Sequence, residues 1–308
     1  MQRLRDERGA VSTVVALLMV PLLGFAAISV DVANLYLKHE QLQSGADAGA
    51  LAVAQDCARD SCGSTSTTAQ TMAAQNLRRG TPQTTVSVAG GQVKVVATTT
   101  VSNTFAGVLG IRSSQVHARS TVAYGAPTGG RTVLPLAFSW CEWNQQTGGG
   151  MPSGTTVRTI SFTKTSGTSC TGPSRNVVPG GFGWLTAGSG CTSTAAIGQT
   201  LYSSPGASVP GGCSTTDFEA VQNRTVLLPL FDQAGDTGSS AWYHLYGYAA
   251  FTVTGYSFVG QYKWNGSGCG GNDRCIKGYF TRFVDLSEAF TYGAGAPQLG
   301  ASVVRLTA

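Results

Sequence analysis

The sequence predicts an α+β protein made of a long N-terminal transmembrane and stalk helix, a small sheet, and a mostly antiparallel β domain with disulfides. Three observations lead to this class. Residues 10–30 carry no charged side chain. Residues 84–101 and 114–124 alternate between polar and apolar side chains with the period of two that is typical of strands. Residues 131–308 consist of short β-like runs separated by glycine turns.

The composition is that of an exported protein. Only 11% of the residues are charged, and 41 are glycine, whereas about a quarter are charged in an ordinary soluble domain. The 20 lysines and arginines are spread along the chain, so we expect no nucleic-acid partner. The eight cysteines form no CxxC pair, which favours disulfides in an oxidising compartment over a zinc site.

Residues 10–30 are predicted to cross the membrane once. As a helix they span about 31 Å, which matches a hydrocarbon core of about 30 Å. Basic side chains precede the span and Asp31 follows it, so the positive-inside rule places residues 1–9 in the cytoplasm and the bulk of the chain outside. A cleaved signal peptide is the alternative, but the apolar run exceeds the usual ~7–15 residues.

The helical pattern continues beyond the span as a stalk over residues 31–56. Apolar and small side chains recur there every three or four residues and form one packing stripe. Such a stripe lets another helix or a sheet approach closely. The sequence leaves open whether it packs against a partner or against the protein's own body.

The start of the chain carries a recognisable combination of residues. Arg8 and Gly9 precede the span, Asp31 and Tyr36 follow it, and residues 42–52 read LQSGADAGALA. Over residues 8–55 the chain resembles the N-terminal region of the TadE/TadG-like proteins of Flp (tight-adherence) pilus assembly, particularly the TadG-like members. The resemblance implies a single-pass envelope protein that works with other Tad/Flp pilus or secretion components and has no catalytic activity.

One departure concerns processing. Prepilins of this pathway carry Glu five residues into the mature helix, where this chain has Val14. A carboxylate inside lipid is unfavourable without a partner, so its absence favours a permanent anchor. From the resemblance and the stripe together, we expect partner or helix packing by Asp31, Tyr36, Leu42, Gln43, Ala46, Asp47 and Ala50.

The middle of the chain, residues 57–125, is predicted to be a small α+β region with pilin-like architecture. Cys57 and Cys62 are close enough in sequence for a local disulfide, and a short helix follows within residues 64–79. Gly90-Gly91 marks a hairpin, and residues 114–124 supply a third strand. The glycine-rich residues 125–131 are predicted to be a linker to the β-rich domain, residues 126–308.

The β-rich domain holds the other six cysteines. Cys269 and Cys275 are predicted to pair locally, and the remaining four have three possible connectivities: Cys141, Cys170, Cys191 and Cys213. Tryptophans beside cysteines at residues 139–143 and 181–191 also resemble the outer region of actinobacterial TadG-like proteins.

No pattern in the sequence indicates catalysis. The chain has three histidines and no GxSxG motif, so we expect a non-enzymatic protein with no catalytic residue, metal or cofactor. An anchored hydrolase would need a carboxylate pair such as Asp217 and Glu219 or Asp232 and Asp236. A membrane-tethered adhesin or glycan-binding module could use an aromatic platform, although aromatic side chains usually pack in the core of a sheet. The platform candidates are Trp242, Tyr246, Tyr248 and Trp264.

Overall fold

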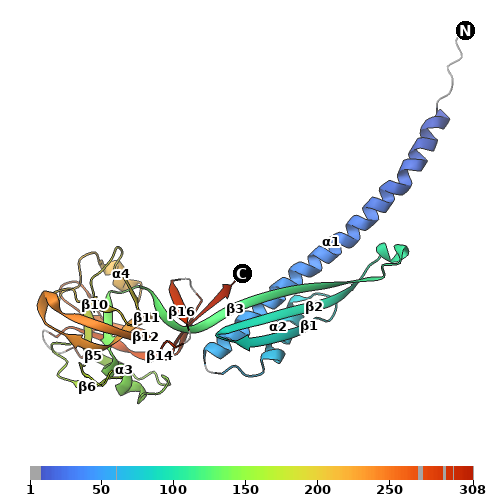
Figure 1. Cartoon of the computed structure of the whole chain (residues 1–308). Coiled ribbons are helices and arrows are strands. Elements are labelled where there is room, and N and C mark those ends of the chain that lie inside the picture. Colours follow the sequence, from blue (N-terminus) through green and yellow to red (C-terminus); the bar gives the residue numbers. More distant parts are fainter. Residues whose placement is uncertain (1–7, 60, 270–272, 287–288, 294, 308) are drawn as a thin grey trace, which may run out of the picture.

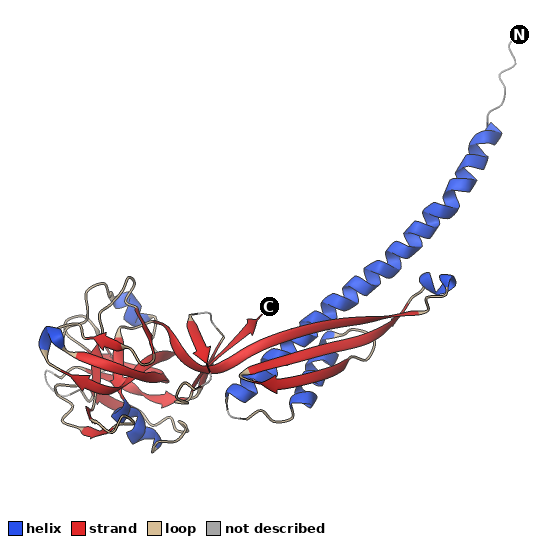
Figure 2. Cartoon of the chain, in the orientation of Figure 1, coloured by secondary structure: helices blue, strands red, loops and turns tan. Residues whose placement is uncertain are grey.

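The computed structural model describes residues 8–59, 61–269, 273–286, 289–293 and 295–307. Helix α1 (Arg8–Ala58) projects from the body as a rod, and only its second half lies beside a sheet (Figure 1). A second β-rich part lies at the far end of the long strand β3 (Ser113–Thr132), as Figure 2 shows by secondary structure. The predicted α+β class is confirmed.

Helix α1 runs without interruption through Pro21. Its most apolar 18-residue window has a mean hydropathy of 2.4, and no part of that window is buried in the protein. The helix is therefore long and apolar enough to cross a membrane. It is the single helix of this kind in the described part of the chain.

The first sheet and a second helix form a proximal module with the second half of α1. A hairpin turns at Gly90 and Gly91, whose φ angles of 58° and 74° suit glycine. This hairpin and the short helix before it are where the sequence predicts them. The module comprises α2 (Thr65–Asn76), β1 (Gln83–Ala89), β2 (Gln92–Ser102), the 3-10 turn η1 (Ala106–Leu109) and the first half of β3.

Small residues let α1 and α2 pack closely. A Cβ atom on Gly45 would lie 2.9 Å from the Cα of Ala73, and one on Gly49 would lie 3.2 Å from the Cα of Ala69. Both alanines are fully buried. The small-residue stripe of the stalk is therefore used within the chain.

The predicted linker at residues 125–131 is wrong, because these residues belong to β3. The glycines there serve close packing. A Cβ on Gly130 would lie 2.2 Å from the ring of Phe290, and one on Gly129 would lie 3.0 Å from the carbonyl oxygen of Ala195. One continuous strand thus connects the two parts of the body.

Strand β3 is paired along most of its length. On one side it pairs with β2 over residues 113–123. On the other it pairs antiparallel with the C-terminal strand β17 over residues 121–125. Further along it pairs with β16 (Phe290–Gly293) and β9 (Ser193–Ala196), while β15 (Phe283–Asp285) pairs with β17 (Ala301–Thr307). The end of the chain therefore returns to the proximal module.

The distal part is built on a second sheet of mostly antiparallel strands. Its core is rich in aromatic rings, such as Phe138, which lies 4.6 Å from Phe251 between ring centroids. The strand order is β5 (Arg158–Ser161), β14 (Cys275–Thr281), β12 (Trp242–Ser257), β11 (Thr225–Gly235), β4 (Leu136–Ser139) and β8 (Phe182–Trp184), with β10 (Thr200–Tyr202) and β13 (Lys263–Trp264) also paired to β12. Around it lie α3 (Trp140–Thr147), α4 (Thr215–Glu219), the 3-10 turn η2 (Gly238–Ser240) and the hairpin of β6 (Ser169–Thr171) and β7 (Val177–Pro179).

Four disulfides are present, and every cysteine in the described residues is paired. Cys57 bonds Cys62 and Cys269 bonds Cys275, the two local pairs that the spacing predicts. The sequence left the other connectivity open. The structure has Cys141 bonded to Cys170 and Cys191 bonded to Cys213.

Candidate functional site

The stalk residues expected to pack divide into groups with different surroundings. Leu42, Ala46 and Ala50 have no exposed surface and belong to the core of the proximal module. They pack α1 onto the protein's own body, which is one of the two alternatives that the sequence leaves open. This side of the helix leaves no surface for a partner at these three positions.

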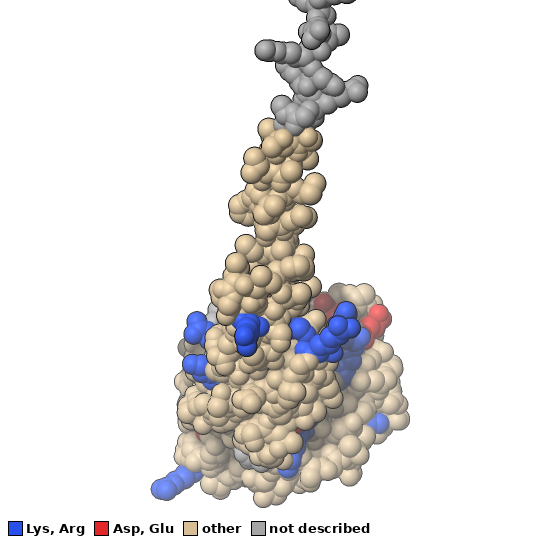
Figure 3. Space-filling model, turned by 90° about the vertical axis from the view of Figure 1, so that its right-hand side faces the viewer, with Lys and Arg blue, Asp and Glu red and all other residues tan. Residues whose placement is uncertain are grey.

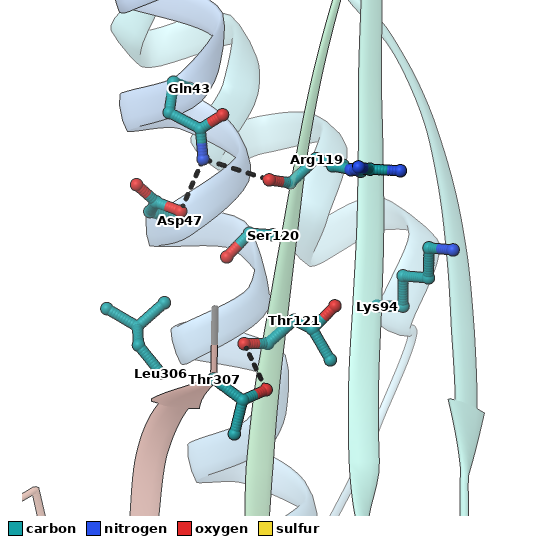
Figure 4. A pocket seen from close by; sticks show the side chains of 8 residues that line it. All are labelled: Gln43, Asp47, Lys94, Arg119, Ser120, Thr121, Leu306 and Thr307. Atoms are coloured by element: carbon teal, nitrogen blue, oxygen red, sulfur yellow. Dashed lines mark hydrogen bonds between the residues drawn. The ribbon is translucent and has the colours of Figure 1, made fainter.

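Gln43 and Asp47 lie beside a stretch of β3 whose edge on this side is not paired with a described strand (Figure 4). The Gln43 Nε2 donates to Asp47 Oδ1 at 2.9 Å and to the carbonyl of Arg119 at 3.0 Å. One turn earlier, His39 Nδ1 donates to the carbonyl of His117 at 3.0 Å. These helix side chains satisfy carbonyls that no neighbouring strand pairs in the described residues, and so they protect an edge that could otherwise recruit another strand.

A polar groove of about 580 Å³ opens where β17 ends and α1 alone faces β3. In Figure 4 the side chains of Lys94 and Arg119 point away from the helix, while Gln43 and Asp47 lie on it. The charged groups therefore do not converge on one point of the groove. This arrangement can cap a strand edge, but it does not assemble a catalytic constellation.

Asp31 is bound to a segment far away in sequence. Its Oδ1 accepts the backbone N–H of Thr104 at 3.0 Å, and its Oδ2 accepts those of Phe105 at 2.9 Å and Ala106 at 2.7 Å. Asp31 as a whole residue is 6% exposed. The bond from Ala106 is the largest influence on its pKa; despite the opposing effect of burial, the three donors hold the pKa of Asp31 below its usual value. Asp31 therefore fastens the turn between β2 and β3 to the helix.

Tyr36 is exposed on α1, just beyond the predicted span. Its side chain is 64% exposed, and Val32, one turn before it, is 57% exposed. Residues four apart lie on the same helix face. Val32 and Tyr36 thus form an apolar face of α1 that the described body does not cover.

The apolar tip, residues 105–111, is not among the site residues that the sequence predicts. This turn contains η1 and follows the strand end at which Asp31 binds. Its exposed apolar side chains are Phe105, Val108, Leu109 and Ile111. The available signal was the run FAGVLGI between two strands, because connections between strands are normally polar.

The four candidate rings of the aromatic platform do not lie together on one exposed face. Tyr248 is 1% exposed, and its hydroxyl donates to the carbonyl of Ala195 at 2.6 Å. Burial raises the pKa of that hydroxyl. Trp264 packs on Tyr256 at 5.8 Å between ring centroids, and Tyr246 packs against the main distal core. Trp242 is only partly exposed.

Irregular pairing explains why these rings share no common face. The register of β12 against β11 shifts at Tyr246, and its register against β14 shifts at Thr254. Each shift inserts one extra residue and reverses which side alternate side chains occupy. Tyr246 and Tyr256 consequently face the main distal core, whereas Tyr248 faces a different cluster.

The members of each candidate carboxylate pair have different surroundings. Asp217 caps the start of α4 by accepting the backbone N–H of Ser214 at 2.7 Å, and Glu219 is exposed. Asp232 is buried and its Oδ1 lies 2.8 Å from Nδ1 of His244, while Asp236 is exposed between β11 and η2. In the described residues, no cluster of three or more histidine, cysteine, aspartate or glutamate side chains could hold a metal ion.

Comparison with known proteins gives one match. Residues 9–56 match the model of a family described as putative Flp pilus-assembly TadE/G-like. No curated protein and no solved structure matches the chain. The matched segment lies within α1 and indicates involvement in Flp pilus assembly, in association with components of that process. The actinobacterial type, which the sequence of the distal part suggested, stays a prediction.

Proposed function

We propose that this chain is a non-enzymatic, single-pass membrane component of Flp pilus assembly. In this role residues 10–30 anchor it in the membrane and the body lies outside the cytoplasm. One observation carries the proposal: the TadE/G-like segment is a single helix that is bare and apolar in its first half and packed on the body in its second.

The bare half of α1 supports the anchor. From Val14 to Val30 its large apolar side chains are between 45% and 74% exposed. Removing one such side chain from water contributes about 1.5–3 kcal/mol. A lipid bilayer removes this whole apolar surface from water at once, without any further polypeptide.

The charges flanking the span support the orientation. Arg3, Arg5 and Arg8 precede it, and Asp31 is the first charged residue after it. Positive side chains stay in the cytoplasm. The four disulfides then lie in a compartment where disulfides form and persist.

The surroundings of the polar side chains favour a non-enzymatic role. Asp217 caps a helix, and Asp232 is paired with His244. The hydroxyl of Ser174 donates to the Asp232 backbone carbonyl at 3.0 Å and makes no described bond to the histidine. The bonds of Asp217, Asp232 and Ser174 are structural, and none of these side chains is positioned as an activated nucleophile.

The exposed face of α1 at Val32 and Tyr36 is the place where we propose that another pilus component binds. It lies directly outside the span, where helices of neighbouring membrane proteins can reach it. A tyrosine with an exposed ring is a common anchor residue in interfaces. The deeper stripe at Leu42, Ala46 and Ala50 serves the fold and leaves this outer face as the contact.

The test uses matched tyrosines in the cell that encodes the protein. Tyr36→Ala should reduce the number of surface pili seen by electron microscopy and weaken co-purification with pilus components, at an unchanged level in the membrane fraction. Tyr202→Ala removes a ring that is 65% exposed on the distal part and should leave both unchanged. Wild-type piliation after deletion of the gene would contradict the proposal.

A second variant tests the absence of catalysis. His244→Ala removes the imidazole that lies 2.8 Å from the buried carboxylate of Asp232 in the distal part. We expect normal piliation from this variant. Loss of pili with an intact fold would favour an anchored enzyme.

A further inference from the structure

The apolar tip, residues 105–111, is unusual for a turn between strands. Val108 is 86% exposed and Leu109 is 73% exposed. The tip is nevertheless well defined, because Asn103 closes the turn. Its backbone N–H donates to the Arg112 carbonyl and its Nδ2 to the Ile111 carbonyl, both at 3.0 Å. A held apolar surface of this kind indicates a contact with something apolar.

The position of the tip identifies that contact. Asp31 holds the start of the tip through the N–H groups of Phe105 and Ala106. Asp31 is also the first residue after the predicted span of residues 10–30. The tip is therefore fixed at the level where α1 leaves the lipid. Figure 1 shows the β2–β3 turn at the end of the sheet that points toward the N-terminus of α1.

The charges near the tip match a lipid surface. Arg112 directly follows it and is exposed. Lys38 donates to the carbonyl of Arg79 and Gln41 accepts the backbone N–H of Arg78, so residues 78 and 79 lie beside the stalk helix. Figure 3 shows lysine and arginine side chains around the base of the stalk. Basic side chains beside exposed apolar ones are the pattern of segments that bind at the headgroup level.

We propose that the apolar tip enters the outer interface of the bilayer and gives the protein a second lipid contact beside its span. Val108 and Leu109 lie among the upper acyl chains, and Arg112 lies at the phosphate level. The span holds the protein along the axis of α1, and the tip holds it at a point beside that axis. Together the two contacts fix the tilt and rotation of the body relative to the membrane. This inference rests on the proposed anchor.

Three valines offer matched reporter positions. Val20 lies in the span and is 74% exposed, Val108 lies in the tip, and Val177 lies in the distal part and is 72% exposed. Because the described cysteines are all paired, a single Val→Cys substitution adds one free thiol for an environment-sensitive fluorophore. The full chain is reconstituted into phosphatidylcholine and phosphatidylglycerol vesicles, with nitroxide-labelled lipids as quenchers.

We expect the label in Val108→Cys to shift to shorter wavelength and to be quenched by lipids with the nitroxide near the headgroup. The Val20→Cys label should be quenched best by deep nitroxides, and the Val177→Cys label by neither. Adding Leu109→Asp to the Val108→Cys chain should abolish the quenching at residue 108. Adding Leu109→Asp to the Val20→Cys chain should leave the quenching at residue 20 intact.

Two results would overturn the inference and leave the anchor standing: a Val108→Cys label that behaves like the Val177→Cys label while the Val20→Cys label is quenched, or a Val108→Cys label that responds only when other pilus components are added. The second result would assign the tip to a protein partner. If the Val20→Cys label is also unquenched, the anchor itself fails and the proposed function fails with it.

Discussion

The proximal module and the distal part fill their cores with different side chains. The main buried cluster of the proximal module consists of alanine, valine, leucine and cysteine side chains, with no aromatic ring among its buried members in the described residues. The main distal cluster has ten aromatic side chains among its buried members. One of them, Phe182, lies 5.5 Å from Trp184 between ring centroids.

The difference follows from what each region has to hold. In the proximal module a helix that continues into the membrane must lie flat on a sheet and on α2, and small side chains allow their backbones to approach closely. In the distal part, rings in edge-to-face contact fill the wider space over a sheet. The proximal core should therefore tolerate added volume poorly, and the distal core should tolerate lost volume poorly.

The distribution of tryptophan allows the two regions to be measured separately. The five tryptophans all lie between residues 140 and 264. Their fluorescence therefore reports on the distal part alone. The far-UV signal of the long helix α1 reports mainly on the proximal module and the span.

The largest effect is expected from a cavity in the distal core. Phe138 has no exposed surface and contacts Phe251 and Phe280 at 4.6 and 5.4 Å between ring centroids. Phe138→Ala should lower the free energy of unfolding of the distal part by about 3–5 kcal/mol, measured by tryptophan fluorescence in urea. Val177→Ala, at an exposed site, should change it by less than about 0.5 kcal/mol.

A smaller effect, confined to the other region, is expected from added volume in the proximal core. Gly45→Val places a side chain against the backbone of Ala73, which a Cβ would approach to 2.9 Å. Overpacking of this kind destabilises by about 1–3 kcal/mol. The helical far-UV signal of the detergent-solubilised chain should melt at lower temperature, with the tryptophan transition unchanged.

Gly24→Val is the matched control on the same helix, because nothing lies within 4 Å of a Cβ at Gly24. It should leave both transitions in place. A different result would be that Gly45→Val and Phe138→Ala each shift the far-UV and the tryptophan transitions together. The two regions would then unfold as one unit, and their cores would not differ in separately measurable stability.

The elements that could be predicted from the sequence are those set by local patterns. The uncharged run of residues 10–30, the hairpin at Gly90-Gly91 and the disulfide of Cys57 with Cys62 each depend on residues close in the chain. Helical and strand periodicity, turn chemistry and short loop closure act over such distances. Because these elements depend on neighbouring residues alone, the sequence predicts them without knowledge of the fold.

The remaining features depend on partners far along the chain. The glycines of residues 125–131 look like a linker until Phe290 is placed against Gly130. The aromatic side chains of β12, among them Tyr246, Tyr248 and Tyr256, alternate in sequence as if they shared one face, but two bulges reverse which side they occupy. Asp31 looks like a charge at the end of a span, but its partners lie 73 to 75 residues away. The small and apolar stripe of the stalk was therefore visible in the sequence, whereas the contacts of Asp31 and the apolar tip were not.

The smallest and most local effect is expected at Asp31, where the proximal module meets the membrane. Asp31→Asn removes the charge that strengthens three hydrogen bonds from Thr104, Phe105 and Ala106. Hydrogen exchange of these amides at neutral pH should quicken several-fold. Asp47→Asn, on the same helix but bonded to Gln43, should leave them unchanged.

The wild-type chain should show the same loosening in acid. Because the three donors lower the pKa of Asp31 in the folded protein, its contribution to stability is complete above the unfolded pKa of about 4 and is lost as the pH falls through the lowered value. Protection of the three amides, corrected for the intrinsic exchange rate at each pH, should therefore decline below about pH 4 in the wild type and stay flat in Asp31→Asn. A flat profile in both would mean that the turn is held by its own bonds at Asn103, and that the carboxylate only occupies a site formed without it.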